Sequence, residues 1–319
     1  MKYTKESLKI VFFGTPDFAV ESLDRLVKGG YNIVGVVTMP DKAAGRGHKM
    51  FQSPVKEYAL KHDLKLLQPV NLKDADFVEE LRSLNADLQI VIAFRMMPEV
   101  VWNMPPLGTF NLHASLLPKY RGAAPINWAV MNGDTETGVT TFFLKHEIDT
   151  GDIIQQERIS IEETDNVGVV HDKLMTLGAG MVIETVDAII DGSVKPIPQE
   201  QLLNKEEEPT PAPKIYKETC QIDFKCSARD VYNHIRGLSP YPAAWTEIKD
   251  ATGVLHSVKI FETALPNDEI IGEPGTIKVT KDTLKIACGD GSIEVLSLQL
   301  AGKKRMTTAE FLRGFKISE

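Results

Sequence analysis

The sequence has few cysteines, no long apolar run and no excess of positive charge. Cys220, Cys226 and Cys288 are too few for a disulfide framework and lack the paired spacing of a zinc site, so we expect small buried residues and no metal. No stretch approaches the ~18 uninterrupted apolar residues of a membrane span. The first residues contain no signal-peptide core. We therefore expect a cytoplasmic protein that does not contact a membrane.

The net charge of −8 argues against a protein that binds nucleic acid by bulk attraction. From Ile215 onward, Lys and Arg equal Asp and Glu in number, so the first two-thirds carries the acidic excess. Any contact with nucleic acid must then come from local basic patches. One candidate is the glycine-containing loop 39–50, which carries Lys42, Arg46 and Lys49. The alternative interpretation of this loop is a solvated surface segment.

Two common catalytic signatures are also missing. The turn at Gly14, after the first predicted strand, is not part of a Gly-x-Gly-x-x-Gly fingerprint, so we expect no nicotinamide cofactor. The sequence contains no Gly-x-Ser-x-Gly elbow. Direct group transfer without a covalent intermediate is therefore favoured over nucleophilic catalysis by the protein.

Strands and helices alternate in the first part of the chain, which predicts an α/β fold with an open, mostly parallel Rossmann-like sheet. A Pro- and Glu-rich stretch at 196–214 predicts an extended, semi-rigid linker. We therefore predict an N-terminal catalytic domain at 1–195 and a second domain at 215–319. The second domain combines a helix at 228–236 with five short strands, which favours a small closed OB-like β-barrel.

The stretch beginning at Gly108 carries an unusual strand. Side chains alternate between the faces of a strand, so Phe110 and Leu112 share one face while Asn111 and His113 share the other with a threonine. An inner strand of such a sheet is normally apolar on both faces. Ligands of open α/β sheets bind beyond the carboxyl ends of the strands, where His113 would lie. The alternative is a strand end whose polar side chains only pair with neighbouring backbone.

An aspartate in the loop 147–152 could complete a site. An adjacent strand end would bring Asp149 next to His113, where a carboxylate fixes the tautomer of an imidazole. Asn111 would supply an amide donor for a developing oxyanion. This set suits attack of an amine on a carbonyl carbon. Ser115 is expected to hydrogen-bond within a turn, and His146 is a weaker rival because it has no asparagine partner.

Several ordered motifs together resemble the folate-dependent formyltransferases. They are Asn111-Leu-His113, Ser115-Leu-Leu-Pro118, Arg121-Gly-Ala-Ala-Pro125 and Asp149-Thr-Gly151. Further stretches resemble the methionyl-tRNA formyltransferase branch of these enzymes. They are Asp41-Lys-Ala-Ala-Gly-Arg-Gly47, Gly237-Leu-Ser-Pro-Tyr-Pro-Ala-Ala-Trp245 and Gly302-Lys-Lys-Arg-Met306 with Phe311-Leu-Arg-Gly314. The resemblance runs from about residue 8 to 316.

The resemblance implies both substrates and site residues. The formyl donor would be 10-formyltetrahydrofolate, and the acceptor would be the amino group of methionyl-initiator-tRNA. Asn111, His113 and Asp149 match the catalytic trio. The residues that would bind folate are Ser115, Leu116, Leu117, Pro118, Ala93 and Phe94. The residues that would contact tRNA are Lys42, Arg46, Lys49, Lys303, Lys304 and Arg305. We expect a monomer.

The chain departs from the family pattern at three places, of which the segment 93–98 is the one expected to line the pterin pocket. The segment Ala93-Phe-Arg-Met-Met-Pro98 replaces a glycine-rich aromatic sequence, Glu147-Ile148 replaces Gly-Leu, and Ala43 replaces a frequent proline. Two alternative functions remain open. One is another folate-dependent transferase or hydrolase that acts on a small molecule. The other is a tRNA-binding relative that has lost catalysis.

Overall fold

A computed structural model describes residues 3–44, 49–202, 209–268 and 272–317 of the chain. The chain forms two compact units. Unit 1 comprises Met1–Gly122, Gly138–Ile159 and His171–Pro211, and unit 2 comprises Ala123–Thr137, Ser160–Val170 and Ala212–Glu319. The units therefore alternate along the chain. The contiguous domains 1–195 and 215–319 remain a prediction.

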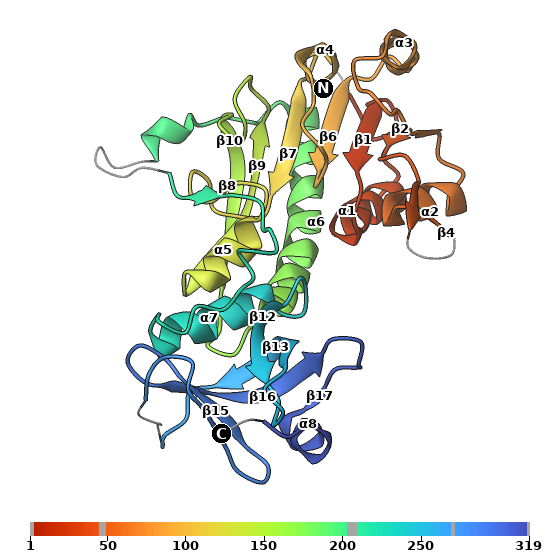
Figure 1. Cartoon of the computed structure of the whole chain (residues 1–319). Helices are drawn as coiled ribbons and strands as arrows, with labels where there is room; N and C mark the ends of the chain where they lie inside the picture. Colours follow the sequence, from red (N-terminus) through yellow and green to blue (C-terminus); the bar gives the residue numbers. More distant parts are fainter. Residues whose placement is uncertain (1–2, 45–48, 203–208, 269–271, 318–319) are drawn as a thin grey trace. The chain divides into compact units, whose positions relative to one another are not determined.

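Unit 1 is built on a seven-stranded sheet (Figure 1). Its strands are β1 (Ile10–Gly14), β2 (Ile33–Val37), β5 (Leu66–Leu67), β6 (Leu88–Ile92), β7 (Thr109–His113), β9 (Glu136–Phe143) and β10 (Ile153–Ser160). The order is β10-β9-β7-β6-β1-β2-β5. Strands β7, β6, β1, β2 and β5 are parallel, and β9 is antiparallel to β7. This mostly parallel Rossmann-like sheet confirms the predicted fold, with its switch point between β1 and β6.

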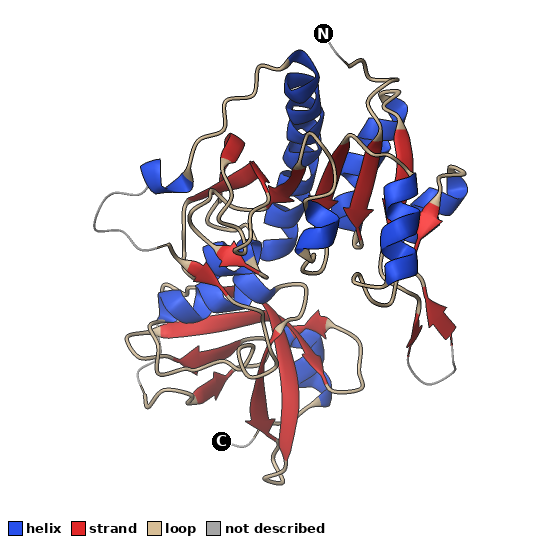
Figure 2. Cartoon of the chain, turned by 90° about the horizontal axis from the view of Figure 1, so that it is seen from above, coloured by secondary structure: helices blue, strands red, loops and turns tan. Residues whose placement is uncertain are grey.

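Helices cover both faces of this sheet (Figure 2). They are α1 (Asp17–Lys28), α2 (Pro54–Lys61), α3 (Ala75–Ser83), α4 (Glu99–Trp102) and α6 (Val167–Asp191). On one face, Phe77 of α3 and Val101 of α4 pack with Val91 of β6. On the other face α6 packs closely against β7 at Gly178. A Cβ at this position would lie 2.7 Å from the Leu112 side chain. Asn111 pairs with Val91 in register, so the polar face of β7 is the face of α3 and α4.

A side-chain cap explains where α3 begins. Asp74 is the N-cap of α3, and its carboxylate accepts from the backbone N–H groups of Asp76 and Phe77. In α1 the N-cap is Pro16, and Asp17 lies in the first turn. The extended conformation of Pro16 suits the N-cap position, and the carboxylate of Asp17 still faces the positive end of the helix dipole.

Unit 2 contains an antiparallel sheet in the order β12-β13-β16-β15-β14, with β17 paired to β16. Its strands are β12 (Ala244–Lys249), β13 (Leu255–Ala264), β14 (Ile277–Val279), β15 (Leu284–Ala287), β16 (Ser292–Leu300) and β17 (Met306–Thr307). Register shifts between Ile260 and Thr263 bend β13. The curved sheet is a half-barrel consistent with the predicted OB-like domain.

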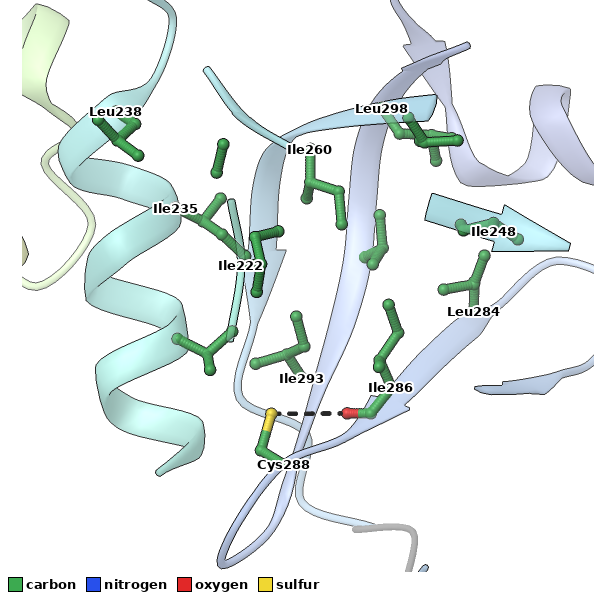
Figure 3. Packing of buried hydrophobic residues seen from close by; sticks show 14 of the residues in the cluster. Ile222, Ile235, Leu238, Ile248, Ile260, Leu284, Ile286, Cys288, Ile293 and Leu298 are labelled. Atoms are coloured by element: carbon green, nitrogen blue, oxygen red, sulfur yellow. Dashed lines mark hydrogen bonds between the residues drawn. The ribbon is translucent and has the colours of Figure 1, made fainter. Parts of the chain in front are cut away.

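Helices α5 (Pro125–Met131), α7 (Ala228–Leu238) and α8 (Thr308–Gly314) complete unit 2. Ile235 and Leu238 of α7 are fully buried in a core with strand residues such as Ile260 and Ile286 (Figure 3). Helix α5 joins this unit because α7 has a glycine where the two helices meet. A Cβ at Gly237 would lie 2.4 Å from Met131 Cγ.

Short elements appear where the sequence predicted irregular segments. The basic loop contains the hairpin β3 (Lys42–Ala44) and β4 (Lys49–Phe51). Strands β8 (Arg121–Gly122) and β11 (Pro211–Ala212) and the 3₁₀ helix η1 (Gln199–Gln201) also form, the last two inside the predicted linker. These elements have two or three residues each, which is too few to show a hydrophobic period.

The three cysteines have different environments. Cys220 and Cys288 are buried as predicted, but Cys226 is exposed, so the prediction was wrong for that residue. Burial raises the pKa of the Cys288 thiol to about 11.

Within the described ranges, no helix combines the length and hydropathy that a membrane span requires.

Candidate active site

Strand β7 places two of the predicted catalytic side chains at the carboxyl edge of the sheet. His113 is buried, with 8% of its surface exposed, and Asn111 is half-buried on the same face. Among the residues that the structure describes, no hydrogen bond of the Asn111 side chain is found, so its amide is available to a ligand. Phe110 and Leu112 are buried on the opposite face, as the alternation predicted.

The imidazole of His113 has a polar partner on each side. Nε2 lies 2.8 Å from the backbone oxygen of Tyr120. A carbonyl only accepts, so Nε2 carries a proton and donates it. Nδ1 lies 4.0 Å from Oδ2 of Asp149, and the ring of Phe142 meets the imidazole edge-on. The structure therefore brings His113 and Asp149 together, with Nδ1 facing the carboxylate.

Asp149 is held by a tight loop between β9 and β10. The backbone N–H of Gly122 donates to its Oδ2 at 2.9 Å. Asp149 has a φ of 54°, a left-handed conformation that costs free energy unless the surroundings enforce it. A Cβ at Gly151 would lie 1.6 Å from the backbone oxygen of Phe143. Only glycine fits at that position, which gives the Asp-Thr-Gly motif a steric reason.

One polar residue at this site was missed in the sequence. Gln199 lies in the predicted linker, yet its side chain is fully buried in contact with the Asp149 loop. Its Nε2 donates to the backbone oxygens of Asp149 and Gly151 at 2.9 and 2.8 Å. Its Oε1 accepts from Nε and Nη2 of Arg121 at 3.1 and 2.6 Å. A glutamine in a Pro- and Glu-rich stretch gives no sequence signal of such a role.

The predicted folate-binding run after β7 folds back on β9. Ser115 Oγ donates to the backbone oxygen of Lys119 at 2.7 Å, which is the turn role expected for this serine. Thr140 Oγ1 donates to Ser115 O and accepts from Leu117 N. Ser115, Leu117 and Pro118 are buried, and Leu116 is half-buried. A role of these residues in binding folate remains a prediction.

A cavity of about 480 Å³ lies beside the segment that follows β6. Its walls include Arg95, Met96, Trp102 and His146. Arg95 donates to the backbone oxygens of Pro69 and Val70, so the guanidinium is committed to one wall. Burial lowers the pKa of Arg95. Volumes of about 300–1,000 Å³ are typical of small-molecule sites, so the cavity has room for a bicyclic ring.

The other predicted residues of that segment, Ala93 and Phe94, are not among the residues that line the cavity. Ala93 is exposed and has a φ of 46°. The Phe94 ring packs edge-on against Phe13 with centroids 5.6 Å apart. His146 is exposed and lines the cavity, whereas His113 faces Asp149, so the two histidines occupy different surroundings.

The predicted basic residues fall into three groups. Lys42 is exposed in β3, whereas Arg46 and the side chain of Lys49 lie outside the described residues. Lys303 and Lys304 are exposed in the turn between β16 and β17. Arg305 instead forms an ion pair with Glu262 at 2.6 Å, and its guanidinium stacks on Phe261. Arg305 is therefore already engaged within unit 2.

The described part of the chain contains no group of three or more His, Cys, Asp or Glu side chains that could hold a metal ion.

Comparison with known proteins identifies the family. A family model described as formyl transferase matches residues 8–186, and one described as formyl transferase, C-terminal domain, matches residues 214–316. A methionyl-tRNA formyltransferase of Bacteroides fragilis is 64% identical over 316 residues, which cover 99% of this chain and 97% of the relative. That of Flavobacterium johnsoniae is 54% identical and is covered over 98% of both chains. The chain belongs to the methionyl-tRNA formyltransferase family.

Solved structures share the fold at lower identity. An N-formyltransferase from Helicobacter canadensis, in complex with folinic acid and dTDP-3-aminofucose, has a TM-score of 0.66 and 20% identity, covering 94% of this chain and 100% of that one. HypX from Aquifex aeolicus in complex with tetrahydrofolic acid has a TM-score of 0.63 and 20% identity, covering 97% of this chain and 48% of that one. At this identity the likeness supports the fold of the family.

Proposed function

We propose that this enzyme transfers a formyl group from 10-formyltetrahydrofolate to the amino group of methionyl-initiator-tRNA. Relatives that are named methionyl-tRNA formyltransferase and are 54–64% identical over nearly their whole length support the acceptor. Proteins of the same fold in complex with tetrahydrofolic acid or folinic acid support a folate donor. In this proposal the enzyme works as a monomer in the cytoplasm, where charged tRNA and reduced folates meet.

The proposed reaction is a direct amine attack. The methionyl nitrogen forms a bond to the formyl carbon while the carbonyl electron pair moves to oxygen. The amide of Asn111 donates to this oxyanion, a contribution that preorganised donors make most strongly in the transition state. The bond from carbon to N10 then breaks, and N10 takes up the proton that the amine loses. His113 and Asp149 carry that proton and balance the charge.

One observation carries this mechanism above all. Nδ1 of His113 and Oδ2 of Asp149 face each other across 4.0 Å, while each residue is fixed from behind by backbone of the same short segment. The separation exceeds a direct hydrogen bond. A polar atom of the reacting groups or a water can therefore contact both side chains. Such prepositioning converts binding energy into rate.

The donor is proposed to bind at the cavity lined by Arg95 and Trp102, which would accept the pterin ring. Ala93 and Phe94 precede Arg95 in the same segment and are proposed to contact the donor from there. In the run Ser115, Leu116, Leu117 and Pro118, the contact with folate would be made mainly by Leu116, the half-buried member. The tRNA contacts are proposed at Lys42, Arg46 and Lys49 and at Lys303, Lys304 and Arg305, where cations can neutralise phosphates.

The decisive experiment incubates the purified protein with 10-formyltetrahydrofolate and methionyl-initiator-tRNA and measures the blocked amino groups of the esterified methionine. We expect formylmethionyl-tRNA as the product, and tetrahydrofolate in equal amount. A parallel reaction contains an amino sugar nucleotide such as dTDP-3-aminofucose in place of tRNA. Formylation of the sugar alone, or release of formate without an acceptor product, would contradict the proposal.

A further inference from the structure

The segment 120–122 links three parts of the site. Tyr120 accepts from His113 through its backbone oxygen, and Gly122 donates to the Asp149 carboxylate through its backbone nitrogen. The side chain between them, Arg121, donates twice to the amide oxygen of Gln199. The relative position of His113 and Asp149 therefore depends on this segment and on what anchors it.

Gln199 closes this arrangement into a ring of contacts. Its amide oxygen is bound to Arg121, and its amide nitrogen is bound to the backbone oxygens of Asp149 and Gly151. Both amide hydrogens and the amide oxygen are thus used, and the side chain has no exposed surface. Two residues before Gln199, backbone hydrogen bonds between Ile197 and Ile153 attach the segment that contains Gln199 to β10.

We propose that Gln199 is a positioning residue of the formyl transfer reaction, acting on Asp149 and, through Arg121, on the backbone that orients His113. This inference rests on the proposed function. Tyr120 and Asp149 both have left-handed backbone, with φ of 61° and 54°, so each needs external contacts to keep its conformation. Gln199 supplies such contacts to the Asp149 loop directly. It never touches the reacting groups.

The chemistry of the contact requires an amide. A side chain that donates two hydrogen bonds to carbonyl oxygens and accepts two from a guanidinium must have an NH2 group and an oxygen on the same carbon. Glutamate has the same size and keeps the acceptor for Arg121. It places a negative oxygen against two carbonyl oxygens, however, which repels the Asp149 loop. Gln199→Glu therefore separates loop anchoring from side-chain volume.

The test compares Gln199→Glu and the neutral Gln199→Met with Gln201→Glu, which makes the same change at an exposed residue of the same 3₁₀ helix. We expect both Gln199 variants to lower kcat by about 100-fold, the effect of a displacement on the order of 1 Å. The KM for each substrate should change less than threefold. Gln201→Glu should behave as the parent. All rates are measured at a temperature where circular dichroism finds every variant folded.

A double substitution distinguishes positioning from a general loss of stability. If Gln199 acts through Asp149, Gln199→Glu should cost nothing further in an Asp149→Asn background. Independent, multiplying losses of rate would overturn the proposal, as would an unchanged kcat in both Gln199 variants. Turnover by the parent enzyme tests the proposed function separately. If the parent does not turn over, the imidazole NMR signals of His113 remain a readout, which should shift in Gln199→Glu and not in Gln201→Glu.

Discussion

Two sets of polar residues that were predicted together differ in how the structure treats them. The catalytic set of Asn111, His113 and Asp149 is buried or half-buried, and His113 and Asp149 each have a hydrogen-bond partner in the backbone. In the turn between β16 and β17, Lys303 and Lys304 are exposed, and no ion pair is found for either among the described residues. The side chain of Arg305 in that turn instead forms an ion pair with Glu262.

The difference matches the two roles that we propose for these sets, catalysis and tRNA binding. Proton transfer and oxyanion stabilisation need atoms held to within a fraction of an ångström, so the surrounding chain must specify each orientation. Attraction to a polyanion depends on charge and screening and tolerates mobile side chains. Substitutions in the first set should therefore change kcat. Substitutions in the second should change tRNA affinity and its dependence on salt.

The largest effect is expected from His113→Ala. Loss of the imidazole should reduce kcat about 10²- to 10⁴-fold, the range of general acid–base catalysis. The affinity for tRNA should stay nearly unchanged, because the histidine is buried at the end of β7. Steady-state formylation and filter binding measure the two quantities. Unaltered turnover would remove His113 from the mechanism.

Gly151→Ala should have the second-largest effect on kcat. Its new methyl group would overlap the backbone oxygen of Phe143, so the Asp149 loop must shift. We expect a loss of about 1–3 kcal/mol in the free energy of unfolding, as overpacking typically costs, and a kcat reduced by more than tenfold. The matched control is Gly314→Ala, where a Cβ meets no atom within 4 Å. Chemical denaturation and kinetics should separate the pair, and equal behaviour would contradict the steric argument.

A smaller effect is expected from the basic turn. The double variant Lys303→Ala/Lys304→Ala should raise the KM for tRNA several-fold and leave kcat unchanged. The slope of log affinity against log salt should fall by about 0.9 for each phosphate that the protein no longer neutralises. Arg305→Ala should change that slope less and the melting temperature more, because Arg305 is paired with Glu262. The reverse order would show that Arg305 leaves its partner on binding RNA.

The smallest effect concerns acid stability of unit 2. Hydrogen bonds from Thr252 and from His256 hold the pKa of the Asp250 carboxyl far below its ordinary value. A carboxyl group whose pKa is depressed in the folded state stabilises that state at pH values above its ordinary pKa. This stabilisation is lost as the pH falls below about 4. The melting temperature of Asp250→Asn should therefore lie below that of the parent at pH 6 and approach it toward pH 2. Asp282→Asn, at an exposed turn, should follow the parent at both pH values.

The local sequence pattern determined the fold class of unit 1 and the position of its polar strand. Nearly continuous apolar strands such as Leu88–Ile92 and the helices between them identify an α/β sheet, because burial on both faces demands that composition. The polar face of β7 could also be predicted from the sequence, because Asn111 and His113 are polar residues in a strand that would otherwise be apolar. The motifs that these residues share with the formyltransferases extended the prediction to the family.

Only the tertiary structure decided how the site is assembled. Gln199 is 50 residues beyond Asp149 in the chain, and nothing in its Pro- and Glu-rich surroundings indicates a buried amide. The engagement of Arg305 by Glu262 and the exposure of Cys226 likewise depend on which segments meet in space. Periodicity records whether a residue faces the core of its own element. It carries no information about partners supplied by a distant segment, such as the amide of Gln199 that binds the backbone of the Asp149 loop.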